Sequence, residues 1–137
     1  MSEKENVFDT PQAHDYKGVS YIDDYETFMI NLQAQGGNMA SGEVGEMIAR
    51  MSAFYTRHNM ILARSLKLFS NVAKETYSQI DNGKPISAAK AEILAAATPE
   101  ANEYQLARVH VQNIEQNINA LKALQRGILN EYSYSGS

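Results

Sequence analysis

Histidine is the side chain in this sequence best suited to binding a metal or transferring a proton near neutral pH. The chain has three, at positions 14, 58 and 110. A di-iron helical bundle places a Glu three residues before a ligand His on each of two helices. Tyr55 and Ala107 hold those positions before His58 and His110, so the chain lacks the ligands for that chemistry. His14 would need metal ligands from elsewhere in the fold.

Nucleophilic and phosphate-binding motifs are missing from the sequence as well. There is no cysteine, and no serine lies in a G-x-S-x-G turn. The glycine pairs Gly36-Gly37 and Gly42/Gly45 lack the Lys-Ser/Thr that completes a phosphate-binding loop. We therefore expect a protein that is not an enzyme and that uses no cofactor or metal.

Three arginines, Arg50, Arg57 and Arg64, recur at intervals of seven residues and would line one flank of a helix. Such a basic flank could receive a nucleic-acid backbone or an acidic protein segment. An ordinary solvated helix surface carries a similar pattern. The acidic chain as a whole, with a net charge of −4, makes nucleic acid the weaker of the two partners.

Negative charge is concentrated near the N-terminus. Residues 1–26 hold seven acids and two lysines, whereas the remaining nine acids and ten bases nearly balance. Residues 1–22 have no helical periodicity, and aromatic side chains are scattered along them. We predict an extended acidic arm over 1–22, anchored by Phe8, Tyr16 and Tyr21, that meets a basic surface on its own chain or on a neighbour.

The elements that would position these residues are helices. Apolar residues repeat with a seven-residue period from Val44 to Ile80, a pattern that strands cannot produce. His58 and Ser65 interrupt it as either a register-fixing polar layer or two residues with no special role. The residues predicted to form an apolar interface stripe on this helix are Met47, Met51, Phe54, Tyr55, Ile61, Leu62, Leu68 and Phe69.

The sequence predicts an all-α fold built on a long antiparallel helical hairpin, over about 42–80 and 99–131. Two short helices are expected at about 24–35 and 87–97. The Asn82-Gly83 pair is compatible with a β-hairpin, but its helical flanks favour a helix–helix turn. We expect three parts: the arm over 1–22, a single helical domain over 23–131 and a polar C-terminal tail over 132–137.

The two long helices differ in the width of their apolar stripes. The first has three apolar positions per heptad through most of its length, whereas the second has essentially two. Part of the first stripe should therefore stay uncovered by the second helix. Burial stabilises by ~25 cal/mol per Å² of apolar surface, so we expect the short helices, further copies of the chain or another subunit to cover it.

No motif in the sequence resembles that of a known family. The leading hypothesis is a structural subunit of a multi-subunit particle, such as a phage or viral virion or connector component. It would act through helix packing and exchange of arms between copies. One alternative is a small acidic adaptor, chaperone or inhibitor of one target protein, and a second is a nucleic-acid packaging factor. We expect a soluble protein, without membrane insertion, that is cytoplasmic during synthesis and then resides in a virion or other large assembly.

Overall fold

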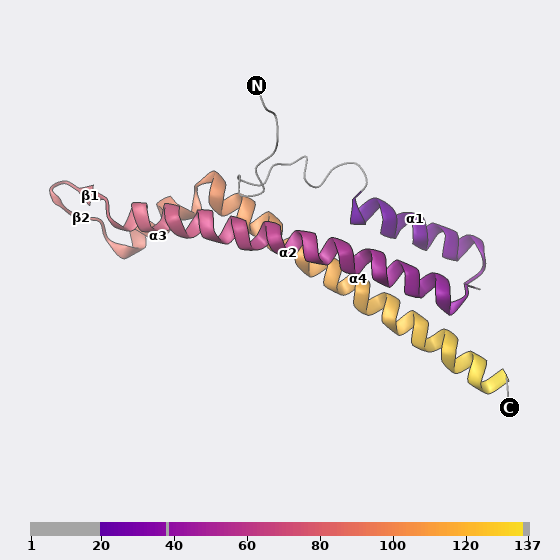
Figure 1. Ribbon diagram of the computed structural model, residues 1–137. Helices are drawn as coiled ribbons and strands as arrows, with labels where there is room; N and C mark the ends of the chain where they lie inside the picture. The colour runs from indigo at the N-terminus through magenta and orange to yellow at the C-terminus, as the bar shows by residue number, and fades with distance from the viewer. Residues whose placement is uncertain (1–19, 38, 136–137) are drawn as a thin grey trace, which may run out of the picture. The chain divides into compact units, whose positions relative to one another are not determined.

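The computed structural model describes residues 20–37 and 39–135, with side chains as far as residue 131. Its elements, labelled in Figure 1, confirm an all-α fold with a long helix pair. Each long helix has 37 residues, which corresponds to a length of about 55 Å. In chain order the elements are α1 (Tyr21–Ala34), α2 (Ser41–Tyr77), β1 (Ile80–Asp81), β2 (Lys84–Pro85), α3 (Ala88–Ala96) and α4 (Pro99–Ser135).

The described residues fall into two compact units, and both long helices contribute to each. The first unit holds residues 58–110, and the second holds 20–57 together with 111–135. In the first unit, Phe69 of α2 stacks on Tyr104 of α4. In the second unit, Tyr55 of α2 lies against Glu115 of α4. The single domain predicted over 23–131 stays a prediction.

The second unit has a core of large aliphatic and aromatic side chains. Here α2 and α4 run antiparallel, because the Gln125 side-chain amide donates to the Ser41 carbonyl while Tyr55 bonds to Glu115. Helix α1 packs against both long helices and closes the core. Its fully or nearly buried members are Tyr21, Leu32, Met39, Val44, Met47, Met51, Ile114, Leu121 and Ile128.

The first unit has a core of smaller residues. Ile61 is the one large aliphatic side chain that is buried among its described residues. Alanines fill most of the remaining apolar positions, and three polar residues of α2 are buried beside them. Short side chains let helices approach closely but bury little area each. The buried alanines are Ala91, Ala95, Ala101 and Ala107, and the buried polar residues are His58, Ser65 and Thr76.

Three helices begin at residues suited to capping. The Ser20 hydroxyl accepts a hydrogen bond from the Asp23 amide, and the Ser87 hydroxyl accepts one from the Lys90 amide. At the start of α4, the Thr98 hydroxyl accepts from the Ala101 amide. Because Ser20 is the cap, α1 starts at Tyr21, earlier than the sequence predicted. The placement of Tyr21 in an extended arm was wrong: it is a buried residue of the first helical turn.

The connection between α2 and α3 corrects a second expectation. Ile80 pairs with Pro85 and Asp81 with Lys84 in a two-stranded antiparallel sheet. Both residues of the intervening loop, Asn82 and Gly83, have positive φ angles, +54° and +79°. A two-residue type I′ hairpin loop requires that geometry. The preference for a helix–helix turn was therefore wrong, because local turn chemistry outweighed the helical flanks.

The core of the second unit makes a testable prediction. Ile114 is fully buried, so Ile114→Ala should leave a cavity and lower the free energy of unfolding by about 2–5 kcal/mol. The matched control is Ile30→Ala, because Ile30 is 64% exposed and its truncation should cost less than about 0.5 kcal/mol. Urea unfolding followed by circular dichroism measures both. Equal losses in the two variants would contradict the assigned core.

Candidate protein–protein interface

The two histidines of the helical core lie together in the first unit. The rings of His58, from α2, and His110, from α4, have centroids 5.8 Å apart. His58 is buried, and burial lowers the pKa of the half-buried His110 below its ordinary value. Within 20–37 and 39–135, no group of three or more His, Asp or Glu side chains is placed to hold a metal ion.

His58 and Ser65, which the sequence leaves open as either a polar layer or two residues with no special role, both lie inside the first unit. Both side chains are buried, and so is that of Thr76, the next-to-last residue of the same helix. The Thr76 hydroxyl donates to the Val72 carbonyl, whereas the Ser65 hydroxyl has no hydrogen-bond partner in the part of the chain that the structure describes. A buried polar group without a partner costs about 1–3 kcal/mol, so this layer weakens the core it interrupts.

The predicted apolar stripe divides between the two units. In the second unit, Met47 and Met51 are buried, and Phe54 and Tyr55 pack against the core. The Tyr21 ring of α1 meets Phe54 edge-on, with centroids 6.3 Å apart. The Tyr55 hydroxyl donates to Glu115 Oε1 at 2.7 Å. The first half of the stripe is therefore largely covered by α1 and α4 of the same chain.

In the first unit the stripe is covered only in part. Ile61 is buried, whereas Leu62, Leu68 and Phe69 remain partly exposed. One face of the Phe69 ring is occupied by Tyr104 of α4, at a centroid distance of 5.6 Å. Arg108 lies over the Tyr104 ring, 5.7 Å from its centroid, and adds a cation–π contact.

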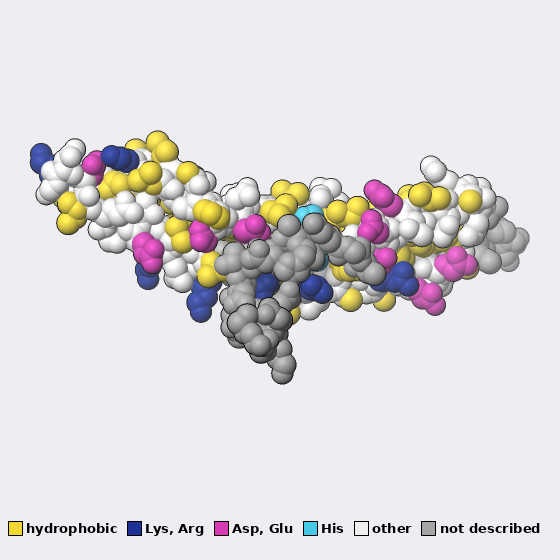
Figure 2. Space-filling model, turned by 90° about the horizontal axis from the view of Figure 1, so that it is seen from above, with side chains coloured by type: hydrophobic (Ala, Val, Ile, Leu, Met, Phe, Trp, Pro, Cys, Tyr) yellow, Lys and Arg dark blue, Asp and Glu magenta, His cyan; other side chains and the backbone are white. Residues whose placement is uncertain are grey.

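The structure adds exposed apolar residues that the predicted stripe missed. Leu66 and Tyr77 of α2 are each 45% exposed. They are eleven residues apart, which returns a helix to nearly the same angular position, so they share one face. The spacing of Leu66 and Tyr77 is visible in the sequence, but the seven-residue period predicted a single apolar stripe on this helix. Figure 2 shows apolar side chains at the surface of the face that it presents.

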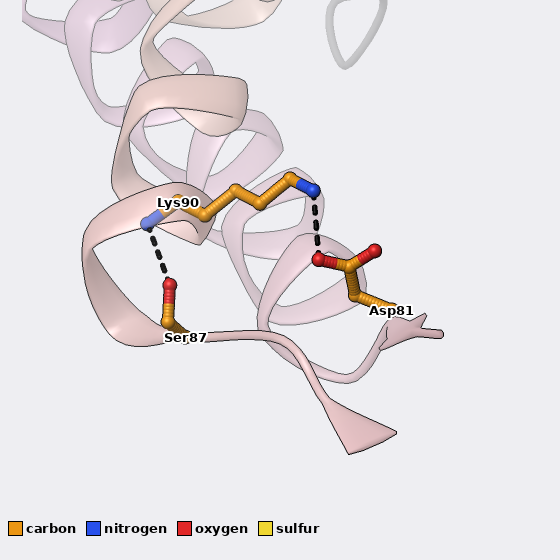
Figure 3. A network of polar contacts seen from close by, with 3 residues as sticks. All are labelled: Asp81, Ser87 and Lys90. Carbon is orange, nitrogen blue, oxygen red and sulfur yellow. Dashed lines mark hydrogen bonds and ion pairs between the residues drawn. The ribbon is translucent and has the colours of Figure 1, made fainter. Parts of the chain in front are cut away.

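Helix α3 buries its small side chains and exposes its large ones. Ala91 and Ala95 are buried, whereas Ile93 is 70% exposed and Leu94 41% exposed. The hairpin is tied to this helix by an ion pair between Lys90 Nζ and Asp81 Oδ2 at 2.7 Å, shown in Figure 3 with the Ser87 cap. Helix α3 therefore buries its alanines in the unit and at the same time exposes apolar surface of its own at Ile93 and Leu94.

The three arginines of the basic flank are not equivalent. Arg50 lies 3.8 Å from Asp24 of α1, a partly exposed ion pair that adds little stability. Arg57 is exposed, whereas Arg64 is half-buried and its Nε atom is fully enclosed. The pair of Arg50 and Asp24 thus brings one acid of the acidic segment 1–26 beside one arginine of the basic flank in the same chain.

The aromatic anchors of the predicted arm lie largely outside the described residues. Phe8 and Tyr16 fall in 1–19, so their role stays a prediction. Tyr21 is described, and it anchors α1: burial raises the pKa of its hydroxyl, while a hydrogen bond with the Asn113 side chain acts in the opposite direction. This contact fixes the first turn of α1 against α4.

Comparisons with known proteins found no match for this chain. No protein-family model matches the sequence, and neither a curated protein nor a solved structure is significantly similar to it. Among residues 20–37 and 39–135, no helix is both long and apolar enough to cross a membrane.

The histidine pair predicts a dependence of stability on pH. Because the folded-state pKa of His110 is depressed, the unfolded chain binds a proton more tightly than the folded chain does. Stability should therefore be complete above the unfolded pKa of about 6.5 and fall as pH drops through the folded pKa. Urea unfolding at neutral and mildly acidic pH should show a smaller loss in His110→Gln than in the wild-type chain. Equal losses would contradict this assignment.

Proposed function

We propose that this chain is a non-enzymatic assembly subunit that works through protein–protein contacts, chiefly with copies of itself. The observation that supports this most directly is the α2 surface of the first unit. There Leu66 and Tyr77 of α2 are nearly half exposed, on a face of the helix next to the buried one. A contiguous exposed apolar surface is a typical mark of a binding interface.

The energetics of this surface favour association. Removing apolar surface from water contributes about 25 cal/mol per Å², and the first unit buries alanines where the second buries methionine, isoleucine and leucine. Its own core is therefore the weaker of the two. A partner that covers the remaining side chains of α2 would supply burial that this unit does not provide for itself.

A multi-subunit particle is the setting that this proposal fits, with a virion or connector as the specific case. Such particles repeat one interface over many copies. In this proposal the acidic residues 1–19 act as an arm that reaches a neighbouring subunit. An adaptor binding one target would use the same apolar surface but would form a one-to-one complex. A packaging factor is less favoured, because Arg50 lies beside Asp24 and Arg64 is half-buried.

Sedimentation of the full-length protein tests the proposal. A monomer has a mass of 15.2 kDa, and we expect a larger species whose population rises with concentration in the range of tens of micromolar. A strict monomer over that range would contradict the proposal.

Removal of residues 1–19 tests the contribution of the arm. Because Ser20 caps α1, this truncation keeps the first helix and its buried Tyr21. We expect weaker self-association with unchanged helicity, measured by sedimentation and circular dichroism. Association of unchanged strength would exclude a role for the arm while leaving the apolar surface as the interface.

A further inference from the structure

The loop of the hairpin, Asn82-Gly83, holds the one asparagine in the sequence that is followed by glycine. The backbone nitrogen of the residue after an asparagine can attack the side-chain amide carbon, and a Cβ on that residue hinders the attack. Glycine has no Cβ. Both loop residues are exposed, so water and hydroxide reach the amide group. The side-chain amide of Asn82 therefore lies beside an unhindered nucleophile from its own backbone.

The Gly83 nitrogen is not held by regular structure. Its amide donates no backbone hydrogen bond to another described residue. Asn82 and Gly83 have φ angles of +54° and +79°, in the left-handed region that costs most residues about 1–2 kcal/mol and asparagine less. Pairing of β1 with β2 holds that conformation, but each strand has two residues and Ile80 is 76% exposed. So short and solvated a hairpin opens readily, which lets the Asn82 side chain reach the nitrogen.

An exposed asparagine elsewhere in the chain, Asn119, provides a comparison. It lies within α4 and precedes Ala120, which carries a Cβ. Inside an α-helix each amide donates to the carbonyl four residues back, so the nitrogen after Asn119 is held away from the side chain before it. Asn119 thus has the reactive group and the solvent access of Asn82 but a different backbone. The two positions separate the effect of exposure from that of the Asn-Gly turn.

We propose that Asn82 is a site of spontaneous deamidation, with the Gly83 backbone as nucleophile and water as co-reactant. The Gly83 nitrogen loses its proton to hydroxide and bonds to Asn82 Cγ. The bond from Cγ to Nδ2 then breaks, and the departing nitrogen takes up a proton from water and leaves as ammonia. Water adds to either carbonyl of the resulting cyclic imide and breaks its bond to the Gly83 nitrogen, which gives aspartate or isoaspartate. No oxidant or reductant takes part.

The two products differ in what they do to the hairpin. Aspartate at position 82 keeps the main chain unchanged, and Asp-Gly suits the same type I′ loop. Isoaspartate routes the main chain through Cβ, so the loop gains one main-chain atom. Because loop length fixes the register of a hairpin, the pairing of Asp81 with Lys84 should be lost in this product.

Loss of that pairing extends to α3. Asp81 Oδ2 lies 2.7 Å from Lys90 Nζ, and this ion pair ties the hairpin to the first turn of α3 (Figure 3). The buried residues of α3 and α4 do not depend on the hairpin strands, so helicity should persist. The reaction therefore changes the connection between α2 and α3 slowly and irreversibly. It is independent of the proposed assembly function.

Ageing of the full-length protein tests the proposal. The folded chain is incubated at mildly alkaline pH, and peptide mass spectrometry follows the exchange of NH2 for OH at each asparagine. We expect Asn82 to react at least about tenfold faster than Asn119. The rate at Asn82 should rise with pH, because hydroxide removes the proton of the attacking nitrogen. Equal rates at the two positions, or an Asn82 that stays intact, would overturn the proposed site.

Two variants separate the reaction from the turn. Asn82→Gly keeps a loop that suits type I′ geometry but has no side-chain amide, so the rapid release of ammonia should disappear. Unchanged release from this variant would place the reaction elsewhere. Asn82→Asp supplies one product directly, and nuclear magnetic resonance should show the amides of Asp81 and Lys84 still paired in it. The isoaspartate form, purified from aged wild-type protein, should have lost that pairing. Retained pairing would overturn the predicted change in the connection.

Discussion

The antiparallel packing of α4 against α2 is the interaction on which the rest of the structure depends. The buried residues of α4, such as Ala107, Ile114 and Leu121, recur at intervals of seven, so this helix offers a narrow apolar stripe. The stripe of α2 is wider, because it carries additional apolar side chains on both sides of that contact. One narrow helix cannot cover a wide one, so each unit needs a further element to cover α2.

The two units meet this requirement differently. In the second, α1 brings large side chains to α2, and Tyr21 packs edge-on against Phe54. In the first, α3 contributes Ala91 and Ala95 and turns Ile93 outward. A small residue allows close approach but covers little of a neighbouring helix. Because the buried side chains of α3 are alanines, this helix can cover less of a neighbouring helix than α1 does.

Much of this architecture could be predicted from the sequence, because long apolar periodicity and helix caps are local signals. The helix class, the long pair and the cap at Ser87 follow from residue spacing alone. The start of α1 at Tyr21 and the hairpin at Asn82-Gly83 do not follow from residue spacing. Each is decided by a capping or turn residue whose preference differs from the pattern of the flanking sequence. The difference in stripe width is readable in the sequence, whereas the exposure of particular side chains such as Leu66 and Ile93 is not.

The buried polar residues of α2 also limit the apolar burial in the first unit. His58, Ser65 and Thr76 occupy buried positions where apolar side chains would contribute more burial. A fourth polar residue in this half of α2, Asn59, is half-buried. Polar groups at seam positions reduce affinity and limit the registers in which helices can pair. A helix that carries such residues at buried and half-buried positions therefore gives up apolar burial and restricts the arrangements in which its neighbours can pack.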